Sequence, residues 1–439
     1  YSYDSRYMLQ ATIRRDGSSV FGDGHQWGYF PSISGAWNIT EEKFMESLKE
    51  SLSLSNLKLR IGYGVSGNAL GFGAYSAVAT YGANGTIISI GGKDYPTLVS
   101  TKLANPDLKW EKTGMLNIGL DYAFFNGRLN GSIEYYNKVT KNLIWNYPVT
   151  SFLYPFSTIS ANVGEITNRG IEISINAIPV QNKNFTWTTT LNLSHNKNKV
   201  NKLTNEKFST ASFTQGDPMV AGVSAEGYTQ QIMEGEPLGT FFTYEFAGYD
   251  EDGTSVYYEH DAETGARTGT TTKAPKFKDR AVTGCAQPKL NMGWNNTFSY
   301  KNWSASFFFT GVFGNKIYNG LRAHYTAPDF FAGGKNVLKE FITERPATDK
   351  SSNVPSDKFI ENGSYVRLQN LTLGYTFRNL DGWLNSLQLY VTANNLFTIT
   401  GYKGLDPEVN LGGIDPGVDY RWSNYPHTRT IMLGAKINF

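Results

Sequence analysis

Apolar and polar residues alternate along much of the chain. Over residues 116–124, for example, Ile118 and Leu120 alternate with Gly119 and Asp121. Successive side chains of a β-strand point to opposite faces, so this period of two predicts a strand. Ile118 and Leu120 would share its apolar face, and Asp121 would lie on its polar face. The same period recurs over residues 57–65, 171–176, 187–194 and 431–439.

The length of these segments helps to separate two kinds of β-protein. A soluble sandwich also produces alternation, because its polar face meets water. Soluble strands usually span about five or six residues, whereas several segments here run for roughly ten residues or more. A tilted strand needs about 9–11 residues to cross the hydrocarbon of a membrane. The lengths therefore favour strands that cross a membrane.

Short and long connections alternate between the predicted strands. In an outer-membrane barrel the periplasmic turns are short and the outer loops are long, a parity that a sandwich does not require. The short connections lie near residues 125–128, 179–184, 300–302 and 379–385. The long ones lie near residues 68–109, 145–160, 200–237, 317–362 and 398–427.

The predicted fold is all-β, a transmembrane antiparallel up-and-down β-barrel to which this chain contributes about fourteen strands. The first strand begins in the stretch Tyr1–Tyr7. The count includes a hairpin within residues 238–288 that turns at Asp250–Gly253, and residues 41–56 add a helical turn. We find no linker or repeat, so residues 1–439 are predicted to form one domain.

Composition changes the picture mainly by exclusion. The 40 Lys and Arg residues nearly balance 38 Asp and Glu residues, which argues against a nucleic-acid surface or a polybasic anchor. One cysteine, Cys285, cannot form an internal disulfide and gives no zinc spacing. The sequence contains no apolar run of about 18 residues that would predict a transmembrane helix, and no signal peptide is visible.

Motifs that would indicate catalysis or metal binding are weak. Gly62-Tyr-Gly64-Val-Ser-Gly67 matches a dinucleotide fingerprint, but more loop follows it where a helix should begin. The acidic stretch around Asp250–Gly253 lacks the glycine and the bidentate glutamate of a calcium loop, so a solvated turn is favoured. The five histidines are scattered, and no nucleophile elbow occurs. We therefore predict no enzyme, no cofactor and no metal site.

Aromatic residues crowd the predicted long loops. Their flat apolar faces suit stacking on sugar rings or peptide side chains. They also suit packing against a protein partner, or a membrane girdle near strand ends. The candidate ligand contacts are Trp145, Tyr154, Phe156, Tyr325 and Phe330.

A series of short motifs gives the chain a family resemblance. They are Arg15-Asp-Gly-Ser-Ser19, Trp27-Gly-Tyr-Phe-Pro-Ser32, Leu59-Arg-Ile-Gly-Tyr-Gly64, Asn105-Pro-Asp-Leu-Lys-Trp-Glu111, the stretch 162–172, the stretch 363–376, the stretch 395–402, Asp406-Pro-Glu408, Tyr425-Pro-His-Thr-Arg429 and the terminal Phe439. In this order they resemble the SusC/RagA-like family of TonB-dependent outer-membrane transporters of Bacteroidetes.

The resemblance implies a function and a set of partners. Such a transporter imports a bulky nutrient, with oligosaccharide favoured over peptide, through a barrel of roughly 22 strands. A SusD-like surface lipoprotein would cover the barrel, and the TonB complex would act on a plug. The plug and the earlier strands are not in this chain and are expected upstream of it. Outer-membrane lipid would surround the barrel, and no nucleic acid is expected.

Within this interpretation the polar alternates of the strands would line the lumen, in contact with plug, water or substrate. These lumen candidates are Lys58, Arg60, Asp121, Glu172, Asn176 and Lys436. Two alternatives belong to other classes. A secreted β-rich glycan-binding or adhesin module would be soluble without detergent. A barrel enzyme would need a convergent Ser/His or carboxylate set, which the sequence does not show.

Overall fold

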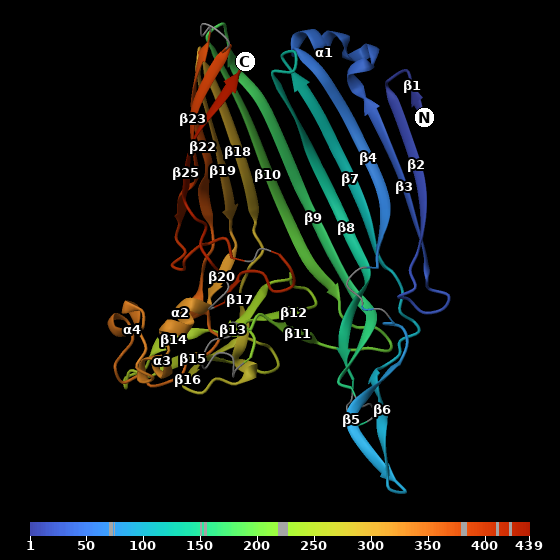
Figure 1. The fold of residues 1–439 in the computed structure, drawn as a ribbon, viewed down its shortest axis with the longest axis vertical. Coiled ribbons are helices and arrows are strands. Elements are labelled where there is room, and N and C mark those ends of the chain that lie inside the picture. The colour runs from blue at the N-terminus through green and yellow to red at the C-terminus, as the bar shows by residue number, and fades with distance from the viewer. Residues whose placement is uncertain are drawn as a thin grey trace.

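One large antiparallel sheet dominates the computed structural model (Figure 1). The described residues are 1–69, 73, 75–149, 152, 156–217, 227–378, 384–409, 412–420 and 424–439. Within them the sheet has 13 strands, in which each strand pairs with the next sheet strand along the chain. These are β1 (Ser2–Tyr3), β2 (Tyr7–Gly17), β3 (Trp27–Asn38), β4 (Leu54–Asn68), β7 (Glu111–Phe124), β8 (Leu129–Pro148), β9 (Thr158–Gln181), β10 (Phe185–Lys202), β18 (Leu290–Tyr300), β19 (Trp303–Phe313), β22 (Tyr365–Arg378), β23 (Ser386–Thr400) and β25 (Thr430–Asn438).

The register of this sheet separates apolar from polar side chains, as the alternation predicts. Leu59 pairs with Leu120 and Ile61 with Ile118, while Lys58 lies opposite Asp121. The apolar face carries many large side chains that are exposed in the isolated chain, for instance Ile61 at 53%. Exposed aliphatic residues along a whole sheet face are unfavourable in water but favourable against lipid. The sheet is therefore a membrane wall with a lipid face and a polar face.

The connections differ at the two ends of the sheet. At one end are tight turns, at 125–128, 182–184 and 301–302, together with the helical connection between β3 and β4. That connection contains η1 (Ile39–Glu41), η2 (Lys43–Met45) and α1 (Glu46–Ser51), which confirms the helical turn predicted over 41–56. The predicted turn at 379–385 lies largely outside the described residues. The opposite end carries the long connections, so the predicted parity is confirmed (Figure 1).

The long connections form a folded layer beyond the end of the sheet, visible at the lower left of Figure 1. It contains three small sheets and several short helices. The first sheet joins β11 (Ser212–Gln215), β12 (Gln230–Met233), β13 (Thr240–Tyr244) and β17 (Arg280–Cys285). The second joins β14 (Phe246–Tyr249), β15 (Ser255–His260) and β16 (Arg267–Thr272), and the third joins β21 (Ile360–Asn362), β20 (Lys316–Asn319) and β24 (Val418–Asp419). The helical elements are η4 (Phe277–Asp279), α2 (Gly320–Tyr325), α3 (Pro328–Ala332), α4 (Lys339–Thr343) and η5 (Asp357–Phe359).

The membrane wall is one sheet thick, so buried clusters lie at its outer end and in this loop layer. A cluster of fully buried residues joins segments that are distant in sequence: Phe241, Ala286, Tyr318, Ala323, Phe359 and Val418. Tyr318 pairs with Val418 in a short parallel ladder, although about a hundred residues separate them in the chain. The layer is thus a compact unit built from the loops between β10 and β18, β19 and β22, and β23 and β25.

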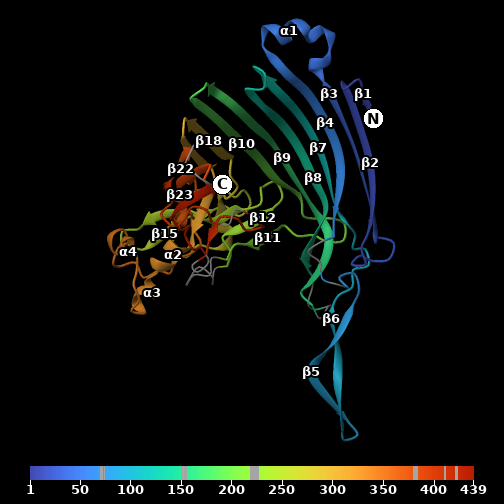
Figure 2. The same cartoon turned by 45° about the horizontal axis from the view of Figure 1, so that its top comes forward.

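One long connection leaves this layer and projects alone. Between β4 and β7 the chain forms a twisted hairpin of β5 (Thr80–Ile90) and β6 (Lys93–Lys102). Figures 1 and 2 both show the hairpin extending away from the sheet and from the loop layer. We call β5 and β6 the projecting hairpin.

The structure corrects three predictions. The hairpin that turns at Asp250–Gly253 is present as β14 and β15, but it belongs to the loop layer, because strands of four and six residues cannot cross a membrane. The hairpin removes two strands from the predicted count, and a turn near the N-terminus splits the first predicted strand into β1 and β2, so the barrel sheet of the described residues has 13 strands, close to the predicted fourteen. The long loop predicted near 145–160 is shorter than expected at both ends, since β8 reaches Pro148 and β9 begins at Thr158. Near the N-terminus, Asp4 and Ser5 adopt positive φ and form a turn within the first predicted strand.

Candidate functional site

The polar face of the sheet brings the lumen candidates together. Cross-strand pairing runs from Arg60 through Gly119 to Glu134, and from Glu134 to Glu172. Because side chains directly opposite one another share a face, this row lies on one side of the wall. By the same register all six candidates occupy that side: Lys58, Arg60, Asp121, Glu172, Asn176 and Lys436.

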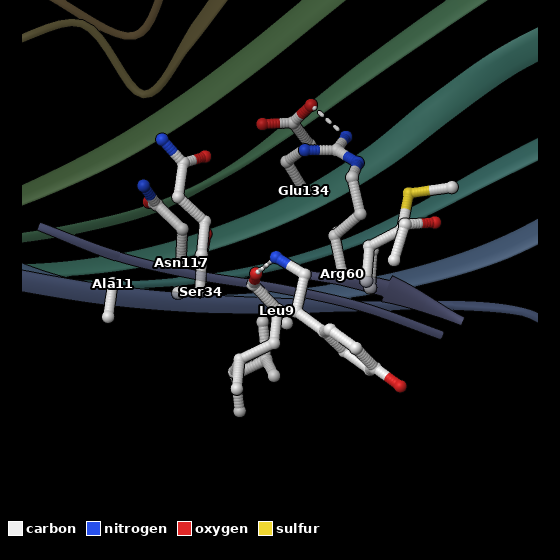
Figure 3. Close-up of a pocket in the computed structure, with 15 residues that line it drawn as sticks. Leu9, Ala11, Ser34, Arg60, Asn117 and Glu134 are labelled. Carbon is white, nitrogen blue, oxygen red and sulfur yellow. Dashed lines mark hydrogen bonds and ion pairs between the residues drawn. The ribbon is translucent and has the colours of Figure 1, made fainter. Parts of the chain in front are cut away.

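Arg60 is the centre of a charged network on this face. Its guanidinium donates two hydrogen bonds of 2.8 Å to the carboxylate of Asp121 and one of 2.8 Å to Glu134. The three residues come from β4, β7 and β8, so the network crosses three adjacent strands. Figure 3 shows Arg60, Asn117 and Glu134 projecting to the same side of the sheet. With two carboxylates around one guanidinium, the cluster presents net negative charge to the lumen.

Hollows follow one another along this polar face. One of about 720 Å³ is bordered by Arg60, Asn117 and Glu134, and a second of about 460 Å³ shares Asn117 and Glu134 with it. A third of about 420 Å³ lies beside Glu134 and Glu172. The remaining polar groups along the two later hollows are mostly amides and hydroxyls: Ser132, Tyr136, Asn168, Ser174, Asn192, Ser194, Asn196 and Asn291. The wall is therefore suited to hydrogen bonding with neutral polar solutes.

Trp145, predicted as a ligand contact, takes part in packing. Its ring centroid lies 5.2 Å from that of Phe213, and Phe213 in turn packs edge-on against Tyr147 at 5.3 Å. Tyr147 is 1% exposed, and its hydroxyl donates to the carbonyl of Leu203. These contacts attach the outer end of β8 to the start of the loop layer, so Trp145 has a structural use independent of any ligand.

The other predicted aromatic contacts do not converge with Trp145. Tyr325 and Phe330 pack edge-on with centroids 5.2 Å apart, on α2 and α3. Figures 1 and 2 show α2 and α3 on the opposite side of the molecule from the end of β8. Phe156 is half-buried in a bend before β9, and Tyr154 lies outside the described residues. Among the four candidates that lie in the described residues, the structure thus brings together only Tyr325 and Phe330.

The loop layer contains a charged cluster that the sequence analysis missed. Arg322 forms a salt bridge with Glu340 and another with Glu361, at 3.3 Å, and donates to the carbonyl of Lys358 at 2.7 Å. The Lys358 ammonium donates to the Tyr249 hydroxyl at 3.0 Å and lies 4.8 Å from the centre of the Phe246 ring. Burial, together with the positive charges of Arg345 and Arg322, lowers the pKa of Lys358 to about 8.

Replacing Lys358 with methionine should stabilise the loop layer at neutral pH. A lysine whose folded pKa lies below its unfolded pKa disfavours folding most at low pH, and this cost disappears as pH rises from about 8 to about 10.5. The shift corresponds to up to about 3 kcal/mol, less about 1 kcal/mol for the lost hydrogen bond to Tyr249. Hydrogen exchange of β14 and η5, followed from about pH 7 to about pH 10, measures the effect.

Lys335→Met is the matched control for this experiment. Lys335 also lies over an aromatic ring, 5.3 Å from the centre of Phe330, but it is exposed. Its replacement should leave the exchange of β14 and η5 within about 0.5 kcal/mol of the parent protein. An equal response of the two variants would contradict the assignment of the pH dependence to Lys358.

A second buried network fixes the last long loop. Arg367, which is 3% exposed, contacts Asp406 and Glu408, each at 2.5 Å, and its Nη1 lies 3.1 Å from Nδ1 of His427. The ligand atoms of Asp406, Glu408 and His427 are within 4.8 Å of one another, a spacing that would also suit a cation. Because the Arg367 guanidinium already pairs with both carboxylates, we interpret this group as an ion-pair network.

Two carboxylates of the acidic turn at Asp250–Gly253 are also paired with a lysine of the same chain. The ammonium of Lys273 lies 2.5 Å from the carboxylate of Asp250 and 3.2 Å from that of Asp252. The hydrogen bond from Lys273 and the N–H of Thr254 lower the pKa of Asp250. The Lys273 ammonium lies where a calcium ion would have to bind, so this segment is interpreted as a solvated turn.

The architecture defines a class of protein: an outer-membrane barrel with a polar wall and an elaborate outer loop layer. A family model described as "TonB dependent receptor-like, beta-barrel" matches residues 1–396, so the chain belongs to the TonB-dependent receptor β-barrel family. Members of this family are outer-membrane transporters and not enzymes. Among the described residues, no helix has both the length and the apolar character needed to cross a membrane.

Individual relatives refine this placement. The chain is 33% identical to TonB-dependent receptor P3 of Formosa agariphila, with all of this chain and 44% of that protein aligned. It is 32% identical to TonB-dependent receptor SusC of Bacteroides thetaiotaomicron, covering 43% of that protein. The structure of the RagAB peptide importer in the "closed-closed" state superposes with a TM-score of 0.82 at 25% identity, over all of this chain and 46% of that one.

These comparisons confirm the SusC/RagA-like resemblance and the outer-membrane location. They set aside the secreted adhesin or glycan-binding module and the barrel enzyme. The chain spans less than half the length of the curated relatives it matches, and no plug lies within it.

Proposed function

We propose that residues 1–439 form one domain, the C-terminal part of the barrel of an active importer for a bulky nutrient. A SusD-like surface lipoprotein would cover the loop layer, and the TonB complex would supply energy through a plug outside this chain. The observation that carries the proposal is a membrane wall with a continuous polar face and hollows of several hundred Å³, beneath long outer loops.

The chemistry of the wall favours oligosaccharide as the nutrient. A sugar chain presents many neutral hydroxyl groups. These can form hydrogen bonds with the amide and hydroxyl side chains that line the two later hollows, such as Ser132 and Asn291. Peptide is the second candidate, supported by the superposition on the RagAB peptide importer. Peptide substrates also carry charges, which the Arg60 network could select.

Binding by the purified whole transporter, with its lipoprotein, tests the nutrient class. Neutral oligosaccharides and peptides of matched mass are compared by calorimetry and by uptake into cells with and without TonB. Saturable, TonB-dependent uptake of oligosaccharide supports the proposal. Uptake of peptides alone would contradict oligosaccharide as the nutrient. Uptake that is independent of TonB would contradict the proposed energy source.

The projecting hairpin supports a protein partner at the outer surface. It exposes large apolar side chains on an element that has only two strands: Tyr81, Ile87, Ile88, Ile90, Tyr95 and Leu98, at 49–73% exposure. A two-stranded hairpin is only marginally stable in water, and apolar patches of this kind usually mark an interface. The lipoprotein is therefore the proposed cover of this hairpin.

Replacing Ile87 and Leu98 with aspartate should weaken capture of the lipoprotein by the whole transporter. Two buried interface side chains of this size contribute enough that we expect a loss of at least about tenfold in affinity. Co-purification and biolayer interferometry with the lipoprotein measure the change. Lys93→Asp is the control, because it alters the charge of the same hairpin without removing apolar surface. If the double variant and the control retain equal affinity, the hairpin is not the docking element.

A further inference from the structure

A basic hollow lies where the barrel wall separates from the loop layer. Pairing between β10 and β18 ends at Ser194 and Asn291, although β10 continues to Lys202. The freed edge of β10 borders a hollow of about 890 Å³, whose other side is formed by β17, by Lys289 and by Lys316 of β20. The hollow therefore opens between the membrane wall and the folded loops.

The lining of this hollow carries a strong excess of positive charge. Glu236 is the one acidic residue among the described residues that line the hollow. Six basic residues surround it: Arg169, His195, Lys197, Lys199, Lys289 and Lys316. All six are exposed, and none of them has a carboxylate within ion-pair distance in the described part of the chain. We call the hollow that these six residues line the basic hollow.

Two members of the basic hollow face each other directly. Lys197 of β10 is paired in register with Arg169 of β9. Like charges directly opposite one another on adjacent strands destabilise a sheet. A comparable pair, Lys112 and Lys141 of β7 and β8, has Glu165 3.8 Å from the Lys141 ammonium. Within the described residues the pair of Lys197 and Arg169 has no such partner, so an external anion is the natural source of compensation.

A direct bond holds the two sides of the hollow together. Nδ1 of His195 lies 2.5 Å from the carbonyl oxygen of Lys289. A carbonyl only accepts hydrogen bonds, so Nδ1 carries the proton and Nε2 is left as the second functional atom of the ring. This bond connects β10 with the segment before β18 at the level where their ladder has ended. The basic residues are thereby held across the opening in a fixed arrangement.

The basic hollow lies at the level of lipid headgroups. On the outer face of β9 the apolar positions end at Ile171, and the next outward-facing residue is Arg169; on β10 they end at Leu193, followed by His195. From Val180 to Ile171 the strand rises about 30 Å along its length, which is about 23 Å of height at a tilt of about 40°. This matches the apolar band of about 25 Å in such barrels. Arg169 and Lys197 therefore emerge just outside the outer edge of the hydrocarbon.

We infer that the basic hollow binds the phosphate groups of lipid headgroups in the outer leaflet. Three observations support this inference. The basic residues are exposed and have no carboxylate partner among the described residues. Two of them face each other in register, and they lie directly above the lipid face of the same strands. Lysine and arginine next to a membrane surface attract anionic headgroups, and each such residue adds to the binding affinity. The inference rests on the outer-membrane location and is independent of the nutrient.

The test compares two double variants of the whole transporter. K197Q/K199Q removes two charges from the basic hollow, and K112Q/K141Q removes two charges from the outer face of β7 and β8 as the control. Each protein is placed in phosphatidylcholine nanodiscs that contain a small proportion of a bis-phosphorylated glucosamine glycolipid. Native mass spectrometry then counts the glycolipid molecules retained per transporter, and titration with inorganic phosphate is run in parallel.

We expect K197Q/K199Q to lower the affinity for the glycolipid by about tenfold or more and K112Q/K141Q to lower it less than threefold. Equal losses in the two variants would indicate general surface attraction and overturn the site. Binding of inorganic phosphate with no preference for glycolipid would overturn the lipid headgroup as the source. Loss of nutrient uptake in K197Q/K199Q with unchanged glycolipid retention would assign the hollow to the nutrient instead. An unchanged circular dichroism spectrum shows that the variants fold.

Discussion

Replacing Arg367 with methionine is expected to destabilise the last long loop by about 3–5 kcal/mol. The guanidinium is buried against Asp406 and also contacts Glu408 and the hydroxyl of Thr398. Removing it leaves the Asp406 carboxylate, which is 4% exposed as a residue, without its counter-charge. Hydrogen exchange over residues 401–409 and 424–429 of the whole transporter measures the loss, because it reports local opening.

Acid should weaken the same loop in the parent protein. Burial would raise the pKa of Asp406, but the N–H groups of His427 and Glu408, with Arg367, hold it below its usual value. A carboxyl whose folded pKa lies below its unfolded pKa stabilises the fold above about pH 4, and this contribution is lost as pH falls through the folded pKa. In Arg367→Met this acid dependence should shrink, because one of its causes has been removed.

Arg378→Met is the control for both measurements. Arg378 is the last residue of the same strand, β22, at the opposite end of the strand from Arg367, and it is exposed. Its replacement should change the exchange of the loop by no more than about 0.5 kcal/mol. If Arg367→Met exchanged no faster than Arg378→Met, the network would not be what holds the loop in place.

Placing arginine at Leu120 should block insertion of the barrel far more than arginine at Asn117. Leu120 pairs with Leu59 and Ile133 on the lipid face, whereas Asn117 borders two hollows on the polar face. A charge on the lipid face costs about 2–4 kcal/mol near the midplane, and a charge in the lumen costs little. Heat-modifiable mobility and protease protection of the outer-membrane fraction measure insertion.

Asn117 is a better matched site than Asp121 for this comparison. Asp121 accepts two hydrogen bonds from Arg60, so an arginine there would also break an ion pair. Equal insertion of the Leu120→Arg and Asn117→Arg proteins would contradict the assignment of the two faces.

The membrane wall was predictable because its rules are local. Alternation within one strand fixes the face of each residue, so Ile118, Leu120 and Asp121 were placed correctly from the sequence. The alternation of short and long connections could be read from the lengths of the segments between predicted strands. Two errors of opposite sign entered the strand count: β14 and β15 were included, because a hairpin signal is local and does not reveal the sheet to which it belongs, and the split between β1 and β2 was missed.

The loop layer was not predictable, because its contacts join segments that are distant in sequence. The amide of Gln230 donates to the carbonyl of Pro416, and Arg345 donates to the carbonyl of Thr326. Trp145 was assigned to ligand contact because composition cannot distinguish an aromatic ring that packs on another ring from one that awaits a sugar. The motif around Asp406 was recognised, but nothing in the sequence pairs it with Arg367.

The break between β10 and β18 has a consequence for how such proteins diversify. Residues 203–289 leave from β10 and return to β18, two strands that pair in register over Phe185–Ser194. A substituted insert that began and ended at the same two strands would leave every ladder of the membrane wall unchanged. The membrane wall can therefore stay unchanged while residues 203–289 change, provided that the loops packed against Phe241 and Ala286 change with them.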